Sequence, residues 1–239
     1  MIQTATINYS DSEKTFEGFI AWNDESHDDR PGILIAHAFG GLSDFEREKA
    51  KELAQLGYVG FAIDMYGKGK RATNNDEARK LMSELNNNRE LLLKRIQLAL
   101  TTLKSQDLID EQKIAAIGFC FGGKCVLDLA RSGEGIKGVV SFHGVYDAPQ
   151  INASQKINCS VLVLHGWEDP ISQPDQTVAL AQELTEKATD WQILSFGHTG
   201  HAFTNPKANH PEKGLFYHEQ SNKRAWKAMQ LFFEEIFQH

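Results

Sequence analysis

Residues 113–125 read KIAAIGFCFGGKC, and this stretch decides how the rest of the chain is interpreted. Its apolar start, residues 114–117, predicts a buried strand, and the apolar periodicity from Val126 onward predicts a helix. Residues 118–122 between them have the pattern Gly-x-Cys-x-Gly. A strand, this pattern and a helix form the layout of a nucleophile elbow in which Cys120 takes the place of the usual serine.

The glycines and the helix both fit a reactive thiol at Cys120. The central residue of such an elbow sits on a strained turn, so the residues two positions away must lack a Cβ for the backbone to pass closely. Gly118 and Gly122 meet that requirement. The helix that follows directs its unpaired N–H groups and its dipole at the sulfur, which favours the thiolate over the thiol.

Two other interpretations of the same stretch compete with the elbow. In the first, Cys120 is a small buried hydrophobic residue in a glycine turn. In the second, residues 118–125 read G-x-x-x-x-G-K-C, which is one residue short of a phosphate-binding P-loop, with Cys125 where Ser or Thr would hold Mg²⁺. Phe119 and Phe121 would crowd a loop that has to lay its N–H groups on phosphates.

Composition restricts the class of protein. The 239 residues suit one large domain, predicted here as residues 1–239, and 41% hydrophobic content is enough for a full core. A net charge of -7 without a basic stripe argues against nucleic acid or an anionic membrane surface as the partner. The N-terminus lacks an apolar signal region and no apolar run approaches membrane-spanning length. An odd, low count of 3 cysteines suits a reducing compartment, so we expect a cytoplasmic protein. We also expect no metal or cofactor.

The hydrophobic pattern predicts an α/β fold. Residues 3–9 and 14–22 alternate and flank a polar turn, which predicts an antiparallel hairpin. Apolar strands are predicted at residues 32–37, 58–64, 138–142, 160–165 and 191–196, alternating with helices at residues 44–56, 76–85, 173–187 and the C-terminal end. A longer helix is predicted after the interruption at residues 86–88, with Leu92, Ile96, Ala99 and Leu103 on one face. This alternation predicts a mostly parallel central sheet with helices on both faces and the hairpin at one edge. Residues 197–219 are predicted to be a long loop.

A thiol nucleophile needs a base and a group that orients the base. In an open α/β sheet these groups lie on loops at the carboxyl ends of strands. His201, with His198 as the alternative, follows the last predicted strand in residues 197–203, GHTGHAF. Asp169, with Glu168 as the alternative, follows another strand in residues 166–170, GWEDP, where the proline fixes the turn.

The other strand-end histidines, His37, His143 and His165, could equally be core residues or loop anchors. The chain order of Cys120, Asp169 and His201 is the order of nucleophile, acid and base in the α/β-hydrolase fold.

On these residues the sequence resembles the dienelactone hydrolase family of α/β-hydrolases. The matching segments are residues 118–123, 64–66, 166–169 and 200–203, in the expected order along most of the chain. The resemblance implies a cysteine hydrolase of small esters or lactones, with Cys120 as nucleophile, His201 as base and Asp169 as the orienting acid, acting through a thioacyl-enzyme.

The predicted mechanism also assigns an oxyanion hole and a pocket. One backbone N–H comes from Phe121, directly after the nucleophile, and a second comes from Ala38 or Phe39. Candidate substrate contacts are His37, Tyr66, Trp167 and Phe203.

The chain departs from the family pattern in two places that bear on the substrate. The family carries a Glu after the first parallel strand, where residues 37–40 here read HAFG. It also has an Arg for the substrate carboxylate where this chain has Asn205, and a neutral amide cannot make the bidentate contact of Arg. This argues against dienelactone itself, unless Lys68, Lys70 or Arg71 supplies a cation.

Two classes of function remain as alternatives to turnover. A hydrolase-fold protein could bind a small lactone or ester with little hydrolysis, because the family's Glu and Arg are missing. A P-loop-like nucleotide binder at residues 118–125 would need Asp64 as its second acidic strand end. The sequence leaves the oligomeric state open between monomer and dimer.

Overall fold

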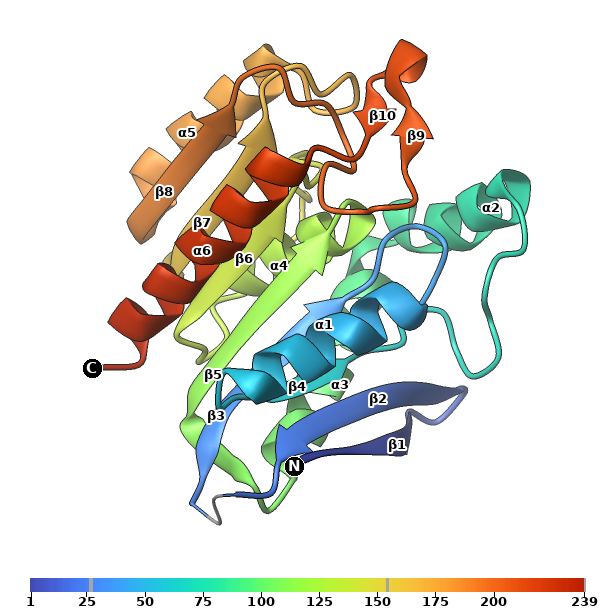
Figure 1. Cartoon of the computed structure of the whole chain (residues 1–239), viewed down its shortest axis with the longest axis vertical. Helices are drawn as coiled ribbons and strands as arrows, with labels where there is room; N and C mark the ends of the chain where they lie inside the picture. The colour runs from blue at the N-terminus through green and yellow to red at the C-terminus, as the bar shows by residue number, and fades with distance from the viewer. Residues whose placement is uncertain (26–27, 154, 239) are drawn as a thin grey trace. The chain divides into compact units, whose positions relative to one another are not determined.

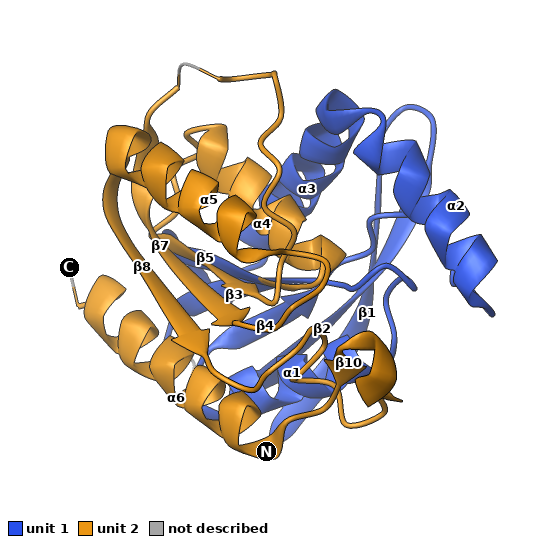
Figure 2. Ribbon diagram, turned by 90° about the horizontal axis from the view of Figure 1, so that it is seen from above, with its two compact units in different colours: residues 1–117 blue, residues 118–239 orange. Residues whose placement is uncertain are grey.

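The computed structural model describes residues 1–25, 28–153 and 155–238 (Figure 1). The chain divides into two compact units, residues 1–117 and residues 118–239, called unit 1 and unit 2 below (Figure 2). Each unit has its own strands and helices, and the interpretation of the chain as a single domain stays a prediction.

Unit 1 begins with the predicted hairpin. Strands β1 (Ile2–Ser10) and β2 (Thr15–Asn23) pair antiparallel. Strand β2 also pairs antiparallel with β4 (Val59–Ala62), which is parallel to β3 (Arg30–Ala36). The strand order β1-β2-β4-β3-β5, where β5 is Ile109–Phe119, places the hairpin at the edge, as predicted.

Helices cover both faces of the unit 1 strands. The helices are α1 (Asp44–Gln55), α2 (Asn75–Asn86) and α3 (Arg89–Lys104). A Cβ on Gly60 would lie 2.7 Å from the Ala50 backbone of α1, whereas one on Gly32 would lie 3.1 Å from Leu103 of α3. Gly60 pairs with Ile33, the residue after Gly32. Because successive strand residues point to opposite faces, α1 and α3 lie on opposite sides.

Unit 2 repeats this arrangement with parallel strands β6 (Gly138–Phe142), β7 (Ile157–Gly166) and β8 (Ala188–Phe196). Figure 2 shows α4 (Phe121–Arg131) and α5 (Pro174–Lys187) on one face and α6 (Glu219–Ile236) on the other. A Cβ on Gly138 would meet Ile236 of α6, and one on Gly123 of α4 would meet Ser141. The predicted α/β fold, with helices on both faces of a mostly parallel sheet, is confirmed.

Two stretches differ from the sequence prediction. The predicted loop 197–219 contains a small antiparallel hairpin, β9 (Asn209–His210) and β10 (Leu215–Phe216), around a 3₁₀ turn, η1 (Pro211–Lys213). Two-residue strands are too short to produce a periodic signal. Strand β5 begins at Ile109, earlier than predicted, because the polar residues 110–113 mask its first half.

No helix in the described part of the chain is long and apolar enough to cross a bilayer.

Candidate active site

Cys120 lies on the sharp turn between the end of β5 and the start of α4. Its backbone φ is 55°, a left-handed conformation that is strained for a residue other than glycine. A Cβ on Gly118 would lie 2.0 Å from the Gly122 carbonyl oxygen, so the turn requires glycine at that position, as predicted. The Cys120 N–H donates to the Phe142 carbonyl of β6 at 3.1 Å, which fixes the turn against the neighbouring strand.

Asp169 lies buried in the turn after β7. Its Oδ1 accepts the backbone N–H groups of Ile171 at 2.8 Å and Ser172 at 3.2 Å. Its Oδ2 lies 2.7 Å from Nδ1 of His201. Both side chains are almost completely buried, so the contact is shielded from water.

The backbone of His201 is held on both sides by the chain around β10. Its N–H donates to the Gly214 carbonyl at 2.7 Å, and its carbonyl accepts from the Phe216 N–H at 3.1 Å. A Cβ on Gly200 would lie 2.2 Å from the Gly214 oxygen, and one on Gly166 would lie 2.4 Å from the Gly200 oxygen. The glycines of both motifs therefore let the end of β7 approach the histidine segment closely.

The second ring nitrogen of His201, Nε2, is the one that does not contact Asp169. Nε2 is buried and has no hydrogen bond of full geometry within the described residues. The charge of each group and a side-chain hydrogen bond between them nevertheless lower the pKa of Cys120 and raise that of His201. We therefore describe Cys120 and His201 as an interacting pair of titratable groups.

The pKa values of Cys120 and His201 shift in opposite directions. Burial lowers the pKa of His201, but the charge of Cys120 and the hydrogen bond that His201 donates to Asp169 outweigh burial and raise it to about 10. Burial raises the pKa of Cys120, but the charge of His201 and the N–H of Phe121 outweigh burial and lower it below 9.0. The two shifts belong to the pair, because each charge stabilises the other.

We expect iodoacetamide to alkylate Cys120 at pH values well below 9.0, the ordinary pKa of its thiol. Only the thiolate reacts, and the lowered pKa keeps the sulfur ionised there. His201 keeps its proton up to a pH of about 10. The rate should fall toward acid as the thiolate takes up a proton, with a midpoint below 9.0. Peptide-resolved mass spectrometry of the alkylated chain measures this profile.

Cys159 provides an internal control for that profile, because burial raises its pKa to about 12 and should leave it unreacted. The variant His201→Asn loses the charge that offsets burial, so the midpoint of Cys120 alkylation should move to higher pH. An unchanged midpoint in this variant would show that the two side chains do not interact.

The alternative acid and base lie outside this cluster. Glu168 and His198 contact each other, with Oε1 and Nδ1 3.2 Å apart, and both side chains are exposed. Trp167 is 47% exposed beside them in sequence. Phe203 is fully buried against His143 and Phe196, so its ring packs in the core.

A model of the dienelactone hydrolase family matches residues 16–237. The chain belongs to the dienelactone hydrolase family. The predicted resemblance is therefore confirmed, and with it the prediction of an ester or lactone hydrolase.

Individual relatives of the dienelactone hydrolase family agree. A protein of Aquifex aeolicus (strain VF5) named "Putative carboxymethylenebutenolidase" is 30% identical over 182 residues, 74% of this chain and 78% of that protein. An uncharacterized protein of Caenorhabditis elegans is 36% identical over 146 residues, 60% of this chain and 92% of its own. A crystal structure of a dienelactone hydrolase-like promiscuous phosphotriesterase from metagenomic libraries is 34% identical, with a TM-score of 0.93 and 98% of both chains covered.

In unit 1, two predicted substrate contacts shape the turn after β3. His37 is buried, and its Nε2 accepts the Met65 N–H at 3.1 Å. Its ring packs against Tyr66 at 4.7 Å, and the Tyr66 hydroxyl donates to the Phe39 carbonyl at 2.9 Å. Both side chains thus hold the backbone that carries the predicted second oxyanion donor.

Sequence reasoning missed a carboxylate at this turn. The dienelactone hydrolase family's Glu is absent from residues 37–38, but Oε1 of the buried Glu46 accepts the Ala38 N–H at 3.3 Å. Its Oε2 accepts from both the N–H and the hydroxyl of Ser43, as a capping box at the start of α1. The Ser-x-x-Glu spacing of residues 43–46 is typical of a helix cap. It does not indicate that the Glu46 carboxylate also accepts the Ala38 N–H. The Ala38 N–H is therefore already engaged within unit 1.

Two of the three cations named as substitutes for the family's Arg are engaged within unit 1. Arg71 lies 3.4 Å from the Asp64 carboxylate, and Lys68 lies 3.4 Å from Glu17. In unit 2, Lys124 is buried and paired with Asp147 at 2.8 Å. A P-loop lysine has to point at phosphates, so the placement of Lys124 argues against nucleotide binding at residues 118–125.

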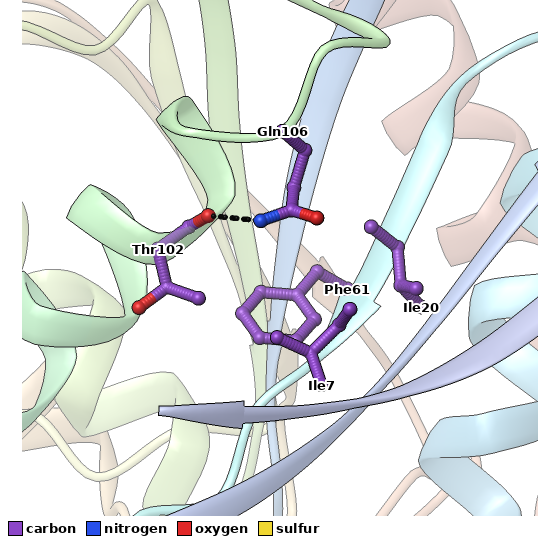
Figure 3. A pocket seen from close by; sticks show the side chains of 5 residues that line it. All are labelled: Ile7, Ile20, Phe61, Thr102 and Gln106. Carbon is purple, nitrogen blue, oxygen red and sulfur yellow. Dashed lines mark hydrogen bonds between the residues drawn. The ribbon is translucent and has the colours of Figure 1, made fainter. Parts of the chain in front are cut away.

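Two hollows in the structure contain none of the predicted site residues. One is a gap of about 110 Å³ in unit 1, lined by Ile7, Ile20, Phe61, Thr102 and Gln106 (Figure 3). Gln106 donates to the Thr102 carbonyl at 2.9 Å, and the gap has no room for a water molecule. The other is a groove of about 550 Å³ in unit 2, along α5 and residues 146–148. No set of three or more possible metal ligands occurs among the described side chains.

Proposed function

We propose that this protein is a cysteine hydrolase that cleaves a small ester or lactone through Cys120, His201 and Asp169. The observation that carries the proposal is the buried contact of 2.7 Å between Asp169 Oδ2 and His201 Nδ1, combined with the opposite pKa shifts of Cys120 and His201. A thiolate next to an oriented imidazolium is the arrangement that nucleophilic catalysis by cysteine needs.

In the proposed first step, the Cys120 thiolate attacks the carbonyl carbon and the carbonyl oxygen becomes an oxyanion. The backbone N–H of Phe121 stabilises that oxyanion, with Phe39 or Ala38 as the second donor. The carbon–oxygen bond of the ester then breaks, and the leaving oxygen takes the proton from Nε2 of His201. The product is a thioester on Cys120.

In the second step, the neutral Nε2 of His201 accepts a proton from water, and the resulting hydroxide attacks the thioester. Cys120 leaves as a thiolate, the carboxylic acid is released, and the thiolate–imidazolium pair is restored. Asp169 keeps the proton of His201 on Nδ1 throughout, so that Nε2 is the nitrogen that gives and takes protons.

We infer that the substrate is uncharged near the scissile bond. Asn205 stands where the family's Arg would bind a carboxylate, and its Oδ1 accepts the Lys207 N–H at 3.0 Å. Relatives named carboxymethylenebutenolidase and lactonase support a lactone or another small ester. The free cysteines of the described chain, Cys120, Cys125 and Cys159, support a reducing compartment such as the cytoplasm.

A phosphotriester is a second candidate substrate. The solved relative at 34% identity is named a promiscuous phosphotriesterase. A thiolate can also attack phosphorus, and the displaced alkoxide would again take its proton from His201.

Acyl-enzyme trapping tests the proposal. Mixing the protein with excess p-nitrophenyl acetate should give a burst of nitrophenol equal to the enzyme present, followed by steady turnover. Acid quenching during the burst should leave one acetyl group on the peptide that carries Cys120. Turnover without that adduct would contradict the thioacyl route. Neither turnover nor an adduct, together with saturable binding of a small lactone, would favour the binding-only alternative.

A further inference from the structure

One buried histidine beside the proposed site has no role in the mechanism above. His143 follows the last residue of β6, is only 2% exposed, and has a φ of 37°. This conformation costs free energy in a residue with a Cβ, and such strain concentrates at functional sites. The residue therefore needs an explanation from its contacts.

His143 contacts the histidine segment in two ways. Its Nε2 lies 2.8 Å from the Thr204 hydroxyl, three residues after His201. Its ring packs edge-to-face on the His201 ring, with centroids 5.0 Å apart and an interplanar angle of 67°. Phe203 covers another side of the His143 ring at 5.2 Å. The side chain thus fixes both the ring plane of His201 and the segment that carries it.

The end of β6 holds the nucleophile as well. The carbonyl of Phe142 accepts the Cys120 N–H at 3.1 Å, and the N–H of the next residue, His143, donates to Leu164 of β7 at 2.8 Å. Two adjacent residues at the end of β6 therefore contact the two proposed reacting residues. Phe142 bonds to the backbone of Cys120, and His143 packs on the ring of His201. Such a common support keeps two reacting groups in register, and a misplacement of about 1 Å can cost about a hundredfold in rate.

The charge state of His143 suits this position. Burial and the neighbouring charge of His201 hold the pKa of His143 well below 6.5, so its ring is neutral. Cys120 and Asp169 raise the pKa of His201, and the charge of His201 in turn lowers the pKa of both His143 and His165. A neutral ring leaves His201 as the imidazolium beside the thiolate, whereas a second cation would repel it.

We propose that His143 is a positioning residue that holds the His201 imidazole at the Cys120 thiolate, through the hydrogen bond to Thr204 and the edge-to-face ring contact. The inference rests on the proposed function, in which Cys120 and His201 are the reacting pair.

Three variants separate the two contacts. Thr204→Val removes the hydroxyl and keeps the ring contact, and His143→Phe keeps a ring but cannot bond to Thr204. The double variant tests whether Thr204 and His143 act through the hydrogen bond between them. Thr177→Val is the matched control, because it removes the hydroxyl 3.2 Å from Nε2 of another buried histidine, His165.

Two readouts are compared, the pH profile of Cys120 alkylation and the split between kcat and KM for p-nitrophenyl acetate. We expect Thr204→Val and His143→Phe to lower kcat about tenfold with little change in KM. They should also move the alkylation midpoint upward by about half a unit or more, because a displaced imidazolium stabilises the thiolate less. The double variant should be no worse than the poorer single variant.

The inference is overturned if Thr204→Val shifts neither readout beyond the Thr177→Val control. If the His143→Phe variant fails to fold, the comparison of Thr204→Val with Thr177→Val alone tests the inference. Alkylation needs no turnover, so an inactive wild type whose midpoint still shifts in Thr204→Val would refute the proposed function alone. An active wild type without any shift would refute the positioning role alone.

Discussion

Replacing Cys120 by alanine is expected to lower kcat for p-nitrophenyl acetate by at least about a thousandfold, because loss of a triad nucleophile typically costs that much or more. The substitution leaves the turn intact, since alanine has the same Cβ. It removes the thiol whose pKa the charge of His201 and the Phe121 N–H lower, which is the proposed nucleophile. Stopped-flow release of nitrophenol at saturating ester measures the loss, with thermal unfolding as the check on the fold.

Cys125→Ala is the matched control for this experiment. Cys125 lies on α4, close in sequence to the elbow, and is fully buried. Its loss should lower stability slightly, as a small cavity does, and leave kcat near the wild-type value. If Cys120→Ala released nitrophenol as fast as the wild type, the thiol mechanism would be wrong.

Asp169→Asn is expected to lower kcat by about a thousandfold, through the tautomer of His201. Oδ1 of Asp169 accepts two backbone N–H groups, from Ile171 and Ser172. An asparagine must therefore place its oxygen at that position and its NH₂ group toward Nδ1 of His201. Nδ1 would then have to act as an acceptor, and the proton would move to Nε2, which could no longer take a proton from the thiol or from water.

The same change should weaken the ion pair. Without the carboxylate, the pKa of His201 loses one of the contributions that raise it. The pKa of Cys120 loses the raising effect of the Asp169 charge and part of the lowering effect of the His201 charge, and its midpoint measures the balance. The ratio of kcat values and the midpoint of Cys120 alkylation are the measurements. Glu168→Gln is the neighbouring control, because its exposed carboxylate pairs only with the exposed His198 in this region and should change kcat by less than twofold, in keeping with the small contribution of surface ion pairs. Equal effects of the two substitutions would exclude the assigned role of Asp169.

The sequence was sufficient for features that depend on local pattern. The Gly-x-Cys-x-Gly elbow, the order of Cys120, Asp169 and His201, and the edge hairpin all follow from the spacing of apolar residues, glycines and prolines. Asp169 and Glu168 are adjacent, and the sequence could rank them only by the proline after Asp169. The structure shows the physical difference, because Asp169 is buried on two backbone donors while Glu168 is exposed.

The sequence did not predict contacts between residues that are far apart along the chain. Glu46 was recognisable as a helix cap, but its bond to the Ala38 N–H depends on how α1 follows β3 in space. His143 and Thr204 are 61 residues apart, and neither carries a motif that predicts their contact. Phe203 was assigned to the substrate pocket because aromatic residues serve equally in pockets and in cores, and the structure places it in the core.

The small β9–β10 hairpin has a consequence for how this scaffold could be modified. His201 is bound through both its backbone groups to Gly214 and Phe216, whereas residues 205–213 extend beyond those contacts. His201 is thus anchored next to a chain segment, residues 205–213, whose central part is exposed. Insertions and substitutions at residues 205–213 are expected to be tolerated, because the backbone bonds of His201 are made to residues outside this stretch.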